Sequence, residues 1–296
     1  MFRIVRLCSV CGPVRSVVVT RSTAALVTGC SSGIGRATAL ALAEAGFPTY
    51  ATARGIDSLA PLVAAGCTAL ACDVTDEASM SEAVAAVEAE HAAVGVLVNN
   101  AGYAEYGPLE EVGLDRWRRE FETNVFGLVR MTQLALPGMR RQRWGRVVNM
   151  SSMGGQMSLP GGSAYHASKY AVEALSDVLR FEVAPFGIEV VVVQPGVIKT
   201  RFMDNALGPE PPAPPTGPYA GLVRMLDQRA RAAYATTAKG ASAQDVAGVV
   251  VKAVPAAHPA TRYKVTAAAR IVPAVRAVLP DRAWDRLLRR QFPTHG

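Results

Sequence analysis

The stretch SAYHASKY, residues 163–170, places a phenol and an ammonium group one helical turn apart. Tyr165 and Lys169 are four residues apart in a segment predicted to begin a helix, so their side chains lie on one face and can act on one small volume. A free Tyr has a pKa of about 10, and a positive charge nearby favours the phenolate. The pair could therefore exchange a proton with a substrate. Because Tyr and Lys are common, the spacing alone favours a half-buried Tyr beside a solvated Lys.

The elements around this pair follow a strand–helix alternation that starts at residue 24. Short β-branched runs alternate with Ala-rich helical patterns, and the predicted strands are 24–28, 48–53, 67–74, 94–100, 145–152 and 188–196. These runs are apolar on both faces, as in a parallel sheet that helices cover on both sides. The pattern predicts an α/β fold with a Rossmann-type, doubly wound parallel sheet of about seven strands.

The turn between the first predicted strand and helix reads TGCSSGIG and carries Gly29, Gly33 and Gly35. Glycines here let the backbone turn tightly and approach a pyrophosphate, while amides at the helix N-terminus face its charge. The spacing is G-x-x-x-G-x-G, which differs from the commoner G-x-G-x-x-G. Because the turn lies between the first strand and helix of an α/β series, it predicts a dinucleotide site.

The end of the second predicted strand indicates which dinucleotide is bound. A carboxylate at this place favours a ribose 2′-hydroxyl, whereas an Arg accommodates a 2′-phosphate. The stretch YATARGID places Arg54 there, with no acidic residue before Asp57, and Arg36 could add positive charge. We therefore expect NADP(H) over NAD(H). The alternative is a solvated Arg54 and binding of both cofactors.

Two further strand ends fit the same cofactor. Asp73 follows the third predicted strand and could touch an adenine edge. The stretch NNAG, residues 99–102, ends the fourth with small residues that let a cofactor lie close.

The motifs together resemble the short-chain dehydrogenase/reductase family over about residues 23–265. The resemblance is carried by T-G-x-x-x-G-x-G at 28–35, N-N-A-G at 99–102, Asn124 in ETNVFG, Ser152, Tyr165 and Lys169. The stretches FETNVFGLVRMTQLALPGMR, ALSDVLRFEVAPFGIEV and TRYKV are more narrowly similar to the 17β-hydroxysteroid and retinol dehydrogenase branch. The resemblance implies reduction of a carbonyl, in which hydride goes to carbon and a proton to oxygen.

The resemblance also implies a role for each catalytic residue. Tyr165 would be the acid in reduction and the base in oxidation, with its pKa lowered by Lys169 and the oxidised nicotinamide. Ser152 would bind the substrate oxygen, with Ser151 as its structural neighbour. Asn124 would hold a water that links Lys169 to solvent, and Lys169 would also bind the nicotinamide ribose.

Cofactor binding falls, by the same resemblance, on loops that follow the predicted strands and on the Tyr–Lys pair. These residues are Gly29, Ser31, Ser32, Gly33, Ile34, Gly35, Arg54, Asp73, Val74, Asn100, Ala101, Gly102, Tyr165, Lys169, Pro195, Gly196, Val197 and Thr200. No metal is expected, because the four His are at no ligand spacing. His166, although next to Tyr165, is assigned neither a metal nor a triad role.

These features predict an NADP(H)-dependent oxidoreductase that interconverts a carbonyl and a secondary or primary alcohol on a lipophilic molecule, such as a steroid or retinoid-like compound. One alternative is a 3-oxoacyl-carrier-protein-type reductase, which the long extension past residue 266 disfavours. The other is a dinucleotide-binding regulator without turnover, which the complete Ser, Tyr and Lys set disfavours.

The chain is divided into three parts. Residues 1–22 are expected to be a poorly ordered extension without a secretory signal, 23–266 one catalytic domain, and 267–296 a helical extension. Two amphipathic helices are predicted in the extension, with Pro280 ending the first and Asp281 capping the second. Their apolar positions are Ile271, Val272, Val275, Val278 and Leu279, then Trp284, Leu287, Leu288 and Phe292. These faces either pack on the body and cover the substrate pocket, or rest on an anionic membrane surface.

Charge and cysteine content limit the partners and the compartment. The net charge of +7 comes from the two ends, since residues 23–220 carry 14 Lys/Arg and 20 Asp/Glu. The acidic body argues against a nucleic-acid partner. Five scattered cysteines indicate a reducing compartment, and Cys8-x-x-Cys11 is interpreted as incidental. We expect a cytoplasmic protein, with membrane association only through the C-terminal helices.

Two expectations concern larger assemblies and movement. The family resemblance implies a homodimer or homotetramer, with the predicted helices 114–139 and 163–184 as contact surfaces. The Pro-rich stretch 208–218 is either a linker or part of a lid over the site.

Overall fold

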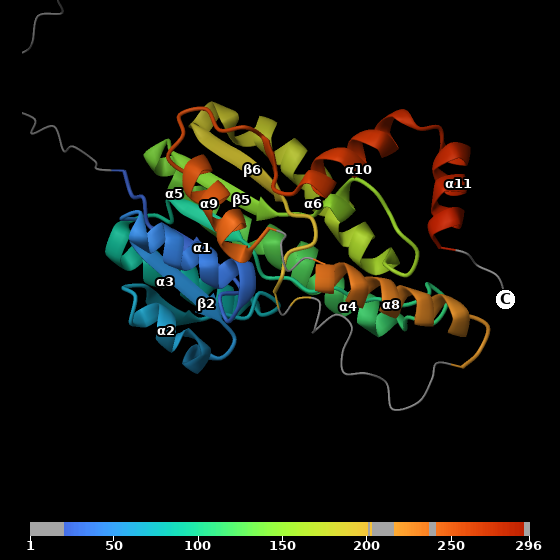
Figure 1. Cartoon of the computed structure of the whole chain (residues 1–296). Helices are drawn as coiled ribbons and strands as arrows, with labels where there is room; N and C mark the ends of the chain where they lie inside the picture. Colours follow the sequence, from blue (N-terminus) through green and yellow to red (C-terminus); the bar gives the residue numbers. More distant parts are fainter. Residues whose placement is uncertain (1–20, 201, 203–215, 237–240, 293–296) are drawn as a thin grey trace, which may run out of the picture.

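A computed structural model describes residues 21–200, 202, 216–236 and 241–292 (Figure 1). The strands in this part of the chain form one parallel sheet in the order β3-β2-β1-β4-β5-β6-β7. They are β1 (Ala25–Val27), β2 (Thr49–Ala53), β3 (Thr68–Ala71), β4 (Val96–Asn99), β5 (Gly145–Met150), β6 (Ile188–Gln194) and β7 (Arg262–Lys264). The predicted doubly wound sheet of seven strands is confirmed. The Cys8–Cys11 pair, residues 1–20 and most of the Pro-rich stretch lie outside the described residues.

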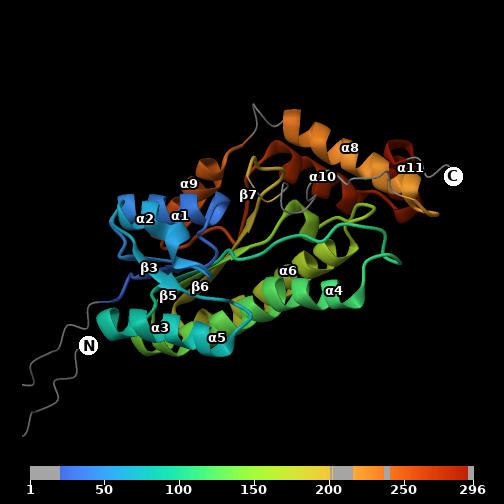
Figure 2. The same cartoon turned by 90° about the horizontal axis from the view of Figure 1, so that it is seen from below.

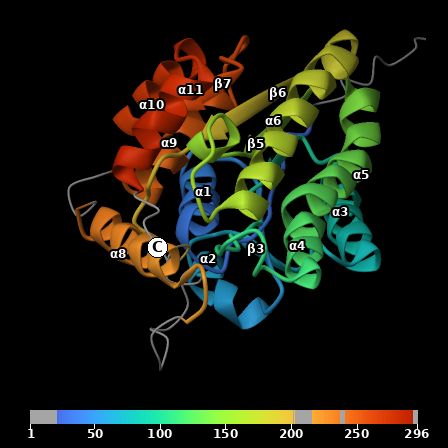
Figure 3. The same ribbon diagram turned by 90° about the vertical axis from the view of Figure 1, so that its right-hand side faces the viewer.

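The helices follow the strands in the alternation that the sequence predicts. They are α1 (Gly33–Glu44), α2 (Ala60–Val63), α3 (Glu77–His91), α4 (Leu114–Phe121), α5 (Gly127–Gln142), α6 (Ser163–Val183), α8 (Ala220–Thr236), α9 (Ala243–Ala253), α10 (Ala267–Val278) and α11 (Asp281–Gln291). Helices α1 and α9 cover one face of the sheet, and α3 to α6 cover the other (Figure 2). Helices α8, α10 and α11 lie on the side of α1 and α9 (Figure 3).

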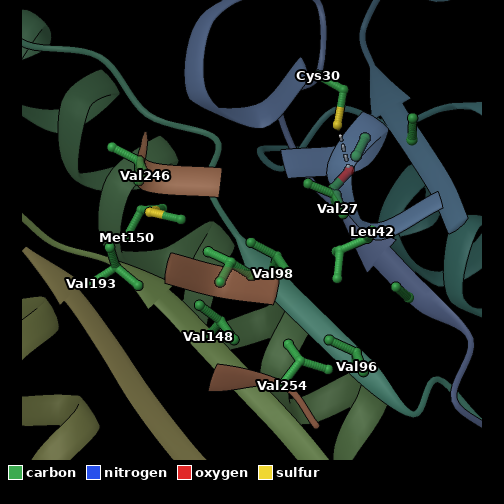
Figure 4. Close-up of a cluster of buried hydrophobic side chains, with 14 of the residues drawn as sticks. Val27, Cys30, Leu42, Val96, Val98, Val148, Met150, Val193, Val246 and Val254 are labelled. Carbon is green, nitrogen blue, oxygen red and sulfur yellow. Dashed lines mark hydrogen bonds between the residues drawn. The ribbon is translucent and has the colours of Figure 1, made fainter. Parts of the chain in front are cut away.

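Side-chain alternation along the strands divides the core into two layers. Val27 of β1 and Val98 of β4 point toward α1 and α9, where they pack in one cluster with Leu42 and Val246 (Figure 4). Leu97, which directly precedes Val98 in β4, points to the other face of the sheet, into a cluster with residues of α3 and α5. Because successive strand side chains face opposite sides, each apolar strand contributes to both layers. This explains why the predicted strands lack a polar face.

Most strands end before the last residue that the sequence assigned to them. The predicted strand 145–152 stops at Met150, and 188–196 stops at Gln194. The residues beyond, Ser151–Ser152 and Pro195–Gly196, leave the sheet at its carboxyl edge and turn into loops. The shortening therefore places residues predicted to be functional at the edge of the sheet instead of within it.

The helix predicted over 114–139 is interrupted. Between α4 and α5 the chain takes a π-helical turn over Glu122–Phe126, which contains Asn124. Such turns insert an extra residue into a helix and are frequent at functional sites. Their local geometry depends on tertiary packing, so hydrophobic periodicity does not reveal them.

The two predicted C-terminal helices are present as α10 and α11, with one correction. Asp281 is the first residue of α11 and makes no cap, because Pro280 occupies the N-cap position. The Asp281 carboxylate instead accepts a hydrogen bond from Arg276, 2.6 Å away across the junction. Within the described part of the chain, none of the helices is long and apolar enough to span a bilayer.

Leu97 provides a test of the two-layer core, since it is fully buried in the central strand. Leu97→Ala should lower the free energy of unfolding by about 2–5 kcal/mol, because it removes buried methyl groups and leaves a cavity. Urea unfolding followed by circular dichroism measures the change. The control is Val63→Ala, whose side chain is 52% exposed on α2, and it should change stability by less than about 0.5 kcal/mol. Equal effects would show that Leu97 is not a core residue.

Candidate active site

A cavity of about 1810 Å³ opens at the carboxyl edge of the sheet. It lies where the strand order reverses, since the chain runs outward from β1 through β2 to β3 and then returns to β4 on the other side. Ligands of doubly wound sheets bind in the crevice that such a reversal creates. Every residue predicted to contact the cofactor lines this cavity, from Gly29 in the first loop to Thr200 after β6.

The glycine turn forms one end of the cavity. Gly29 has a φ of +72°, a backbone conformation that favours glycine. At Gly35 an added Cβ would lie 2.3 Å from the carbonyl oxygen of Gly29, so the first turn of α1 packs directly on the loop. Ser32 is the N-cap residue of α1, and its side chain accepts no hydrogen bond from the helix. The first amides of α1 are therefore oriented toward an anion in the cavity.

Hydrogen bonds join the glycine turn to the NNAG loop. The Thr28 hydroxyl accepts hydrogen bonds from the backbone amides of Asn100 and Ala101, both at 3.0 Å. The Asn100 side chain donates back to the carbonyls of Thr28, at 2.8 Å, and Gly29, at 3.1 Å. Asn100 thus holds the ends of β1 and β4 together, and this role makes it structural as well as a wall of the cavity.

The two arginines near the second strand have different surroundings. Arg54 is exposed, lines the cavity and makes no side-chain hydrogen bond or ion pair within the described chain. Arg36 does not line the cavity, because its guanidinium donates to the carbonyls of Ser31 and Ser58. Arg36 thus ties the glycine turn to the segment after β2 through Ser31 and Ser58, which both line the cavity, and it keeps its positive charge there. Arg54 lines this end of the cavity with its own side chain.

Asp73 lies in the wall as predicted, but its carboxylate already has local partners. Its Oδ1 accepts hydrogen bonds from the amide of Thr75, at 3.0 Å, and from the Thr75 hydroxyl, at 2.8 Å. These bonds fix the side chain in the turn after β3. On the opposite side, Thr200 lies against Gly33, whose added Cβ would be 3.3 Å from the Thr200 Cβ. The two segments bracket the cavity.

Tyr165 and Lys169 lie in the middle of the cavity wall, both buried. The Lys169 Nζ donates a hydrogen bond to the carbonyl oxygen of Met150, 2.9 Å away, at the end of β5. The same Nζ is 5.9 Å from the centre of the Tyr165 ring. Burial lowers the pKa of Lys169 to about 8, although Glu120 and Glu173 act in the opposite direction. The ammonium therefore depends on nearby carboxylates to keep its proton at neutral pH.

The pKa of the Tyr165 phenol is raised, which differs from the lowered value that the sequence suggested. Burial is the largest cause, and the charges of Tyr106 and Glu120 act in the same direction, whereas a hydrogen bond with Ser152 opposes them. The free-energy cost of removing a phenolate from water is larger than the stabilisation that the Ser152 hydrogen bond gives it. In the protein alone, Tyr165 is thus held as a neutral acid.

Ser152 follows β5 and lines the cavity beside Tyr165. Its hydroxyl oxygen accepts a hydrogen bond from the amide of Gly154 at 3.0 Å, and this bond fixes the side chain at the start of the next loop. Ser151 is also buried there, and its hydroxyl has no hydrogen-bond partner among the described residues. Ser152, and not its neighbour, interacts with the phenol.

Asn124 is buried behind the cavity and does not line it. Its side-chain amide donates to the carbonyl of Tyr103, at 2.8 Å, and to the Ser168 hydroxyl, at 3.0 Å, and its Oδ1 accepts from the amide of Tyr103. Gly102 leaves space between the groups, since an added Cβ would lie 2.9 Å from Asn124 Oδ1 and 3.7 Å from Lys169 Nζ. Asn124 and Lys169 therefore face the same small volume.

His166 fastens the loop that follows Ser152. Its Nε2 accepts a hydrogen bond from the amide of Leu159 at 3.1 Å, and its Nδ1 lies 2.9 Å from the carbonyl oxygen of Gly154. Both ring nitrogens thus have backbone partners, and burial lowers the pKa of the imidazole. This arrangement suits a neutral, structural His.

The rest of the lining was not predicted, and it has a polar part, with Glu105, Arg119 and Glu122, and an apolar part. The apolar part combines residues of the loop after Ser152, of the segment after β6, of α8 and of the position just after α11, which are Met153, Met157, Leu159, Pro160, Phe202, Leu226 and Phe292. These positions are far apart in the sequence and lack a motif. The one usable signal was the apolar face of the last helix, which includes Phe292.

The two C-terminal helices differ in how they pack. Trp284 of α11 and Phe292, the C-cap residue just after it, are buried, and the Arg229 guanidinium of α8 lies 4.8 Å from the centre of the Phe292 ring. In α10, Ile271 is 60% exposed and Val278 is 79% exposed. The prediction that the apolar face packs on the body therefore holds for α11, whereas α10 keeps part of its apolar face in solvent.

Comparisons with known proteins agree with this geometry. A family model described as short chain dehydrogenase matches residues 23–210. The oxidoreductase YbbO of Escherichia coli is 36% identical over 265 residues, covering 89% of this chain and 93% of that protein. Human 17-beta-hydroxysteroid dehydrogenase type 1 is 37% identical over 273 residues, covering 88% and 81%. The NADPH-dependent 3-dehydrocapnine reductase of Ornithobacterium rhinotracheale is 34% identical over 275 residues, covering 89% and 95%.

A solved structure shows the same fold with a cofactor. The short-chain dehydrogenase/reductase of Burkholderia phymatum in complex with NAD superimposes with a TM-score of 0.73 at 27% identity, covering 86% of this chain and 92% of that one. The resemblance drawn from the motifs is confirmed. The chain belongs to the short-chain dehydrogenase/reductase family and is an oxidoreductase that acts on CH–OH groups with a nicotinamide dinucleotide.

Proposed function

We propose that the protein is an NADP(H)-dependent oxidoreductase that interconverts a carbonyl and an alcohol on a lipophilic molecule. The observation that carries this proposal is that Tyr165, Ser152 and Lys169 line the same cavity as a group of apolar side chains. A polar reacting group would reach the phenol while the rest of the substrate lies against Met157, Phe202 and their neighbours.

The residues of the site fit this chemistry. The nicotinamide ring, when bound, supplies or accepts the hydride. Tyr165, held neutral by burial, gives its proton to the carbonyl oxygen in reduction and takes it back in oxidation. Ser152 donates a hydrogen bond to the same oxygen. The Lys169 ammonium stabilises the phenolate left behind and binds the ribose, and Asn124 holds the water that connects Lys169 with solvent.

NADP(H) is preferred because Arg54 is an exposed cation at the end of β2 with no acidic residue beside it. Its guanidinium can bind a 2′-phosphate through two parallel hydrogen bonds. The NADPH-dependent relative supports this preference, whereas the complex of the Burkholderia phymatum protein with NAD represents the alternative.

A lipophilic substrate such as a steroid or retinoid-like molecule is favoured over an acyl group on a carrier protein. The end of α11 contributes Phe292 to the cavity, so the C-terminal extension adds apolar surface to the substrate wall. A free lipophilic molecule would use that surface along its length, whereas a carrier-bound acyl chain needs an open path for its linker.

Two surfaces suit partners of the enzyme. Helix α6 exposes Phe181, at 80%, and Val178, at 58%, which fits a homodimer or homotetramer formed through α4 to α6. On α10, exposed Ile271 directly follows Arg270, and exposed Val278 lies four residues before Arg282 of α11. Apolar side chains beside arginines suit the surface of an anionic membrane.

Tyr165→Phe tests the acid. The variant should keep its fold and its cofactor affinity, because the ring still fills its space, yet lose most turnover with a panel of ketosteroids, retinal and acetoacetyl thioesters. NADPH oxidation followed at 340 nm measures the rate. Tyr170→Phe, five residues further along the same helix and 43% exposed, should behave as wild type. A Tyr165→Phe rate above about a tenth of wild type, equivalent to about 1.4 kcal/mol, would exclude Tyr165 as the proton donor.

Arg54→Asp tests the cofactor preference. The change replaces a partner of the 2′-phosphate with a repelling charge, so NADPH should bind at least about tenfold more weakly, while NADH binding changes little. Fluorescence titration of the two cofactors gives the dissociation constants. Lys252→Asp, an equal charge change on α9 outside the cavity, is the control. Equal losses for NADPH and NADH would mean that Arg54 does not recognise the phosphate.

Replacing Ile271 and Val278 together by Ser tests the lipid contact. Wild type should sediment with anionic vesicles at low salt and be released at high salt, and the double variant should stay in solution. Val63→Ser, on the exposed surface of α2, should sediment as wild type does. If the wild type does not sediment with the vesicles, the proposed membrane contact of α10 is refuted.

A further inference from the structure

A fully buried carboxylate lies one helical turn before Asn124 and has no place in the chemistry above. Glu120, in α4, has no solvent-exposed surface and does not line the cavity. Its Oε1 accepts a hydrogen bond from the Asn124 side chain at 3.2 Å, and its Oε2 accepts one from the backbone amide of Glu105 at 3.2 Å. A buried acid is expensive to ionise, so its presence needs a reason.

We propose that Glu120 is a positioning residue of the reaction, which holds Asn124 in place and supplies the negative charge that keeps the Lys169–Tyr165 pair protonated. The inference rests on the proposed roles of those two residues. Glu120 does not touch the cavity, so it acts on the substrate only through them. Its place on the i, i+4 row of the helix brings it to Asn124 across the start of the π-helical turn.

The surroundings of Glu120 come from three segments of the chain. The titratable groups that face it are Tyr103, Glu105 and Tyr106 of the loop after β4, Arg116 of its own helix, and Tyr165 and Lys169 of α6. Arg116 pairs with the Glu105 carboxylate, so the nearest surface cation is already neutralised. The Glu120 carboxylate therefore interacts mainly with the buried Lys169 ammonium.

The charge of Glu120 affects the protonation of Lys169 and Tyr165. Burial raises the pKa of Glu120 to about 7, with Lys169 among the groups that oppose the shift. In turn the ionised carboxylate raises the pKa of both Lys169 and Tyr165. Without it, the ammonium and the phenol would both lose their protons at a lower pH. Glu120 thus extends to higher pH the range in which the pair can deliver a proton.

Glu120→Gln tests this directly, because it keeps the length and an oxygen acceptor but removes the charge. The alkaline limb of kcat/KM for ketone reduction should move to lower pH by about one unit, with little change at low pH. Glu120→Asp keeps the charge and shortens the side chain, so its alkaline limb should stay close to that of wild type while kcat falls. Asp115→Asn removes a charge from the exposed start of the same helix. It should change neither the alkaline limb nor kcat.

Thermal unfolding of the cofactor-free protein provides a readout that does not need turnover. An acid whose pKa is higher in the folded protein than in the unfolded chain stabilises the fold at low pH, and that contribution is lost as pH rises through the folded pKa. Glu120→Gln lacks this loss. The Tm of the variant minus that of wild type should therefore be larger at about pH 8 than at about pH 5.

The outcomes separate this proposal from the proposed function. An alkaline limb that does not move in Glu120→Gln overturns the role of Glu120, whatever the unfolding data show, and leaves Tyr165 as the acid. A wild type without turnover on any carbonyl refutes the proposed function instead. In that case, a Tm difference that does not change with pH would also refute the ionisation of Glu120. A Tm difference that rises with pH would support it.

Discussion

The burial of the Lys169 ammonium beside Tyr165 is the constraint on which the rest of the site depends. A charge removed from water needs fixed partners, and the structure provides the Met150 carbonyl at 2.9 Å and carboxylates on two sides of the ammonium. Those partners come from β5, α4 and α6, so the ammonium can be held only when three elements pack correctly. In the proposed reaction, its position would fix where a substrate oxygen meets the phenol.

The sheet supplies this packing through the way its strands end. Strands β1, β4, β5 and β6 stop one or two residues before their predicted ends, and the loops that follow turn the site residues toward the cavity at the reversal between β1 and β4. Thr28 and Asn100 lock two of these ends by hydrogen bonds between backbone and side chain. Rigid strand ends keep the glycine turn and the Tyr–Lys pair at a fixed separation, which the proposed hydride transfer would require.

The apolar part of the cavity lining follows a different principle, since it is assembled from segments that are distant in the chain. Leu226 and Phe292 line the same cavity as Met157 only because α8 and α11 fold back over the carboxyl edge of the sheet. The apolar wall is therefore separable from the cofactor end. Changes in α8 or α11 could alter the substrate without disturbing the glycine turn.

The features that depend on local spacing can be read directly from the amino-acid sequence. The alternation of strands and helices, the glycine turn, the i, i+4 relation of Tyr165 and Lys169, and the two C-terminal helices all follow from periodicity and backbone sterics, which act over a few residues. Which neighbours each polar group has depends on tertiary packing. Arg36 donates to backbone carbonyls, and Asp281 accepts a hydrogen bond from Arg276 and caps no helix. Asn124 lies behind the cavity, and Glu120 is buried next to Asn124. Burial and long-range contacts set the pKa values, and for that reason the raised pKa of Tyr165 could not be read from its sequence neighbours.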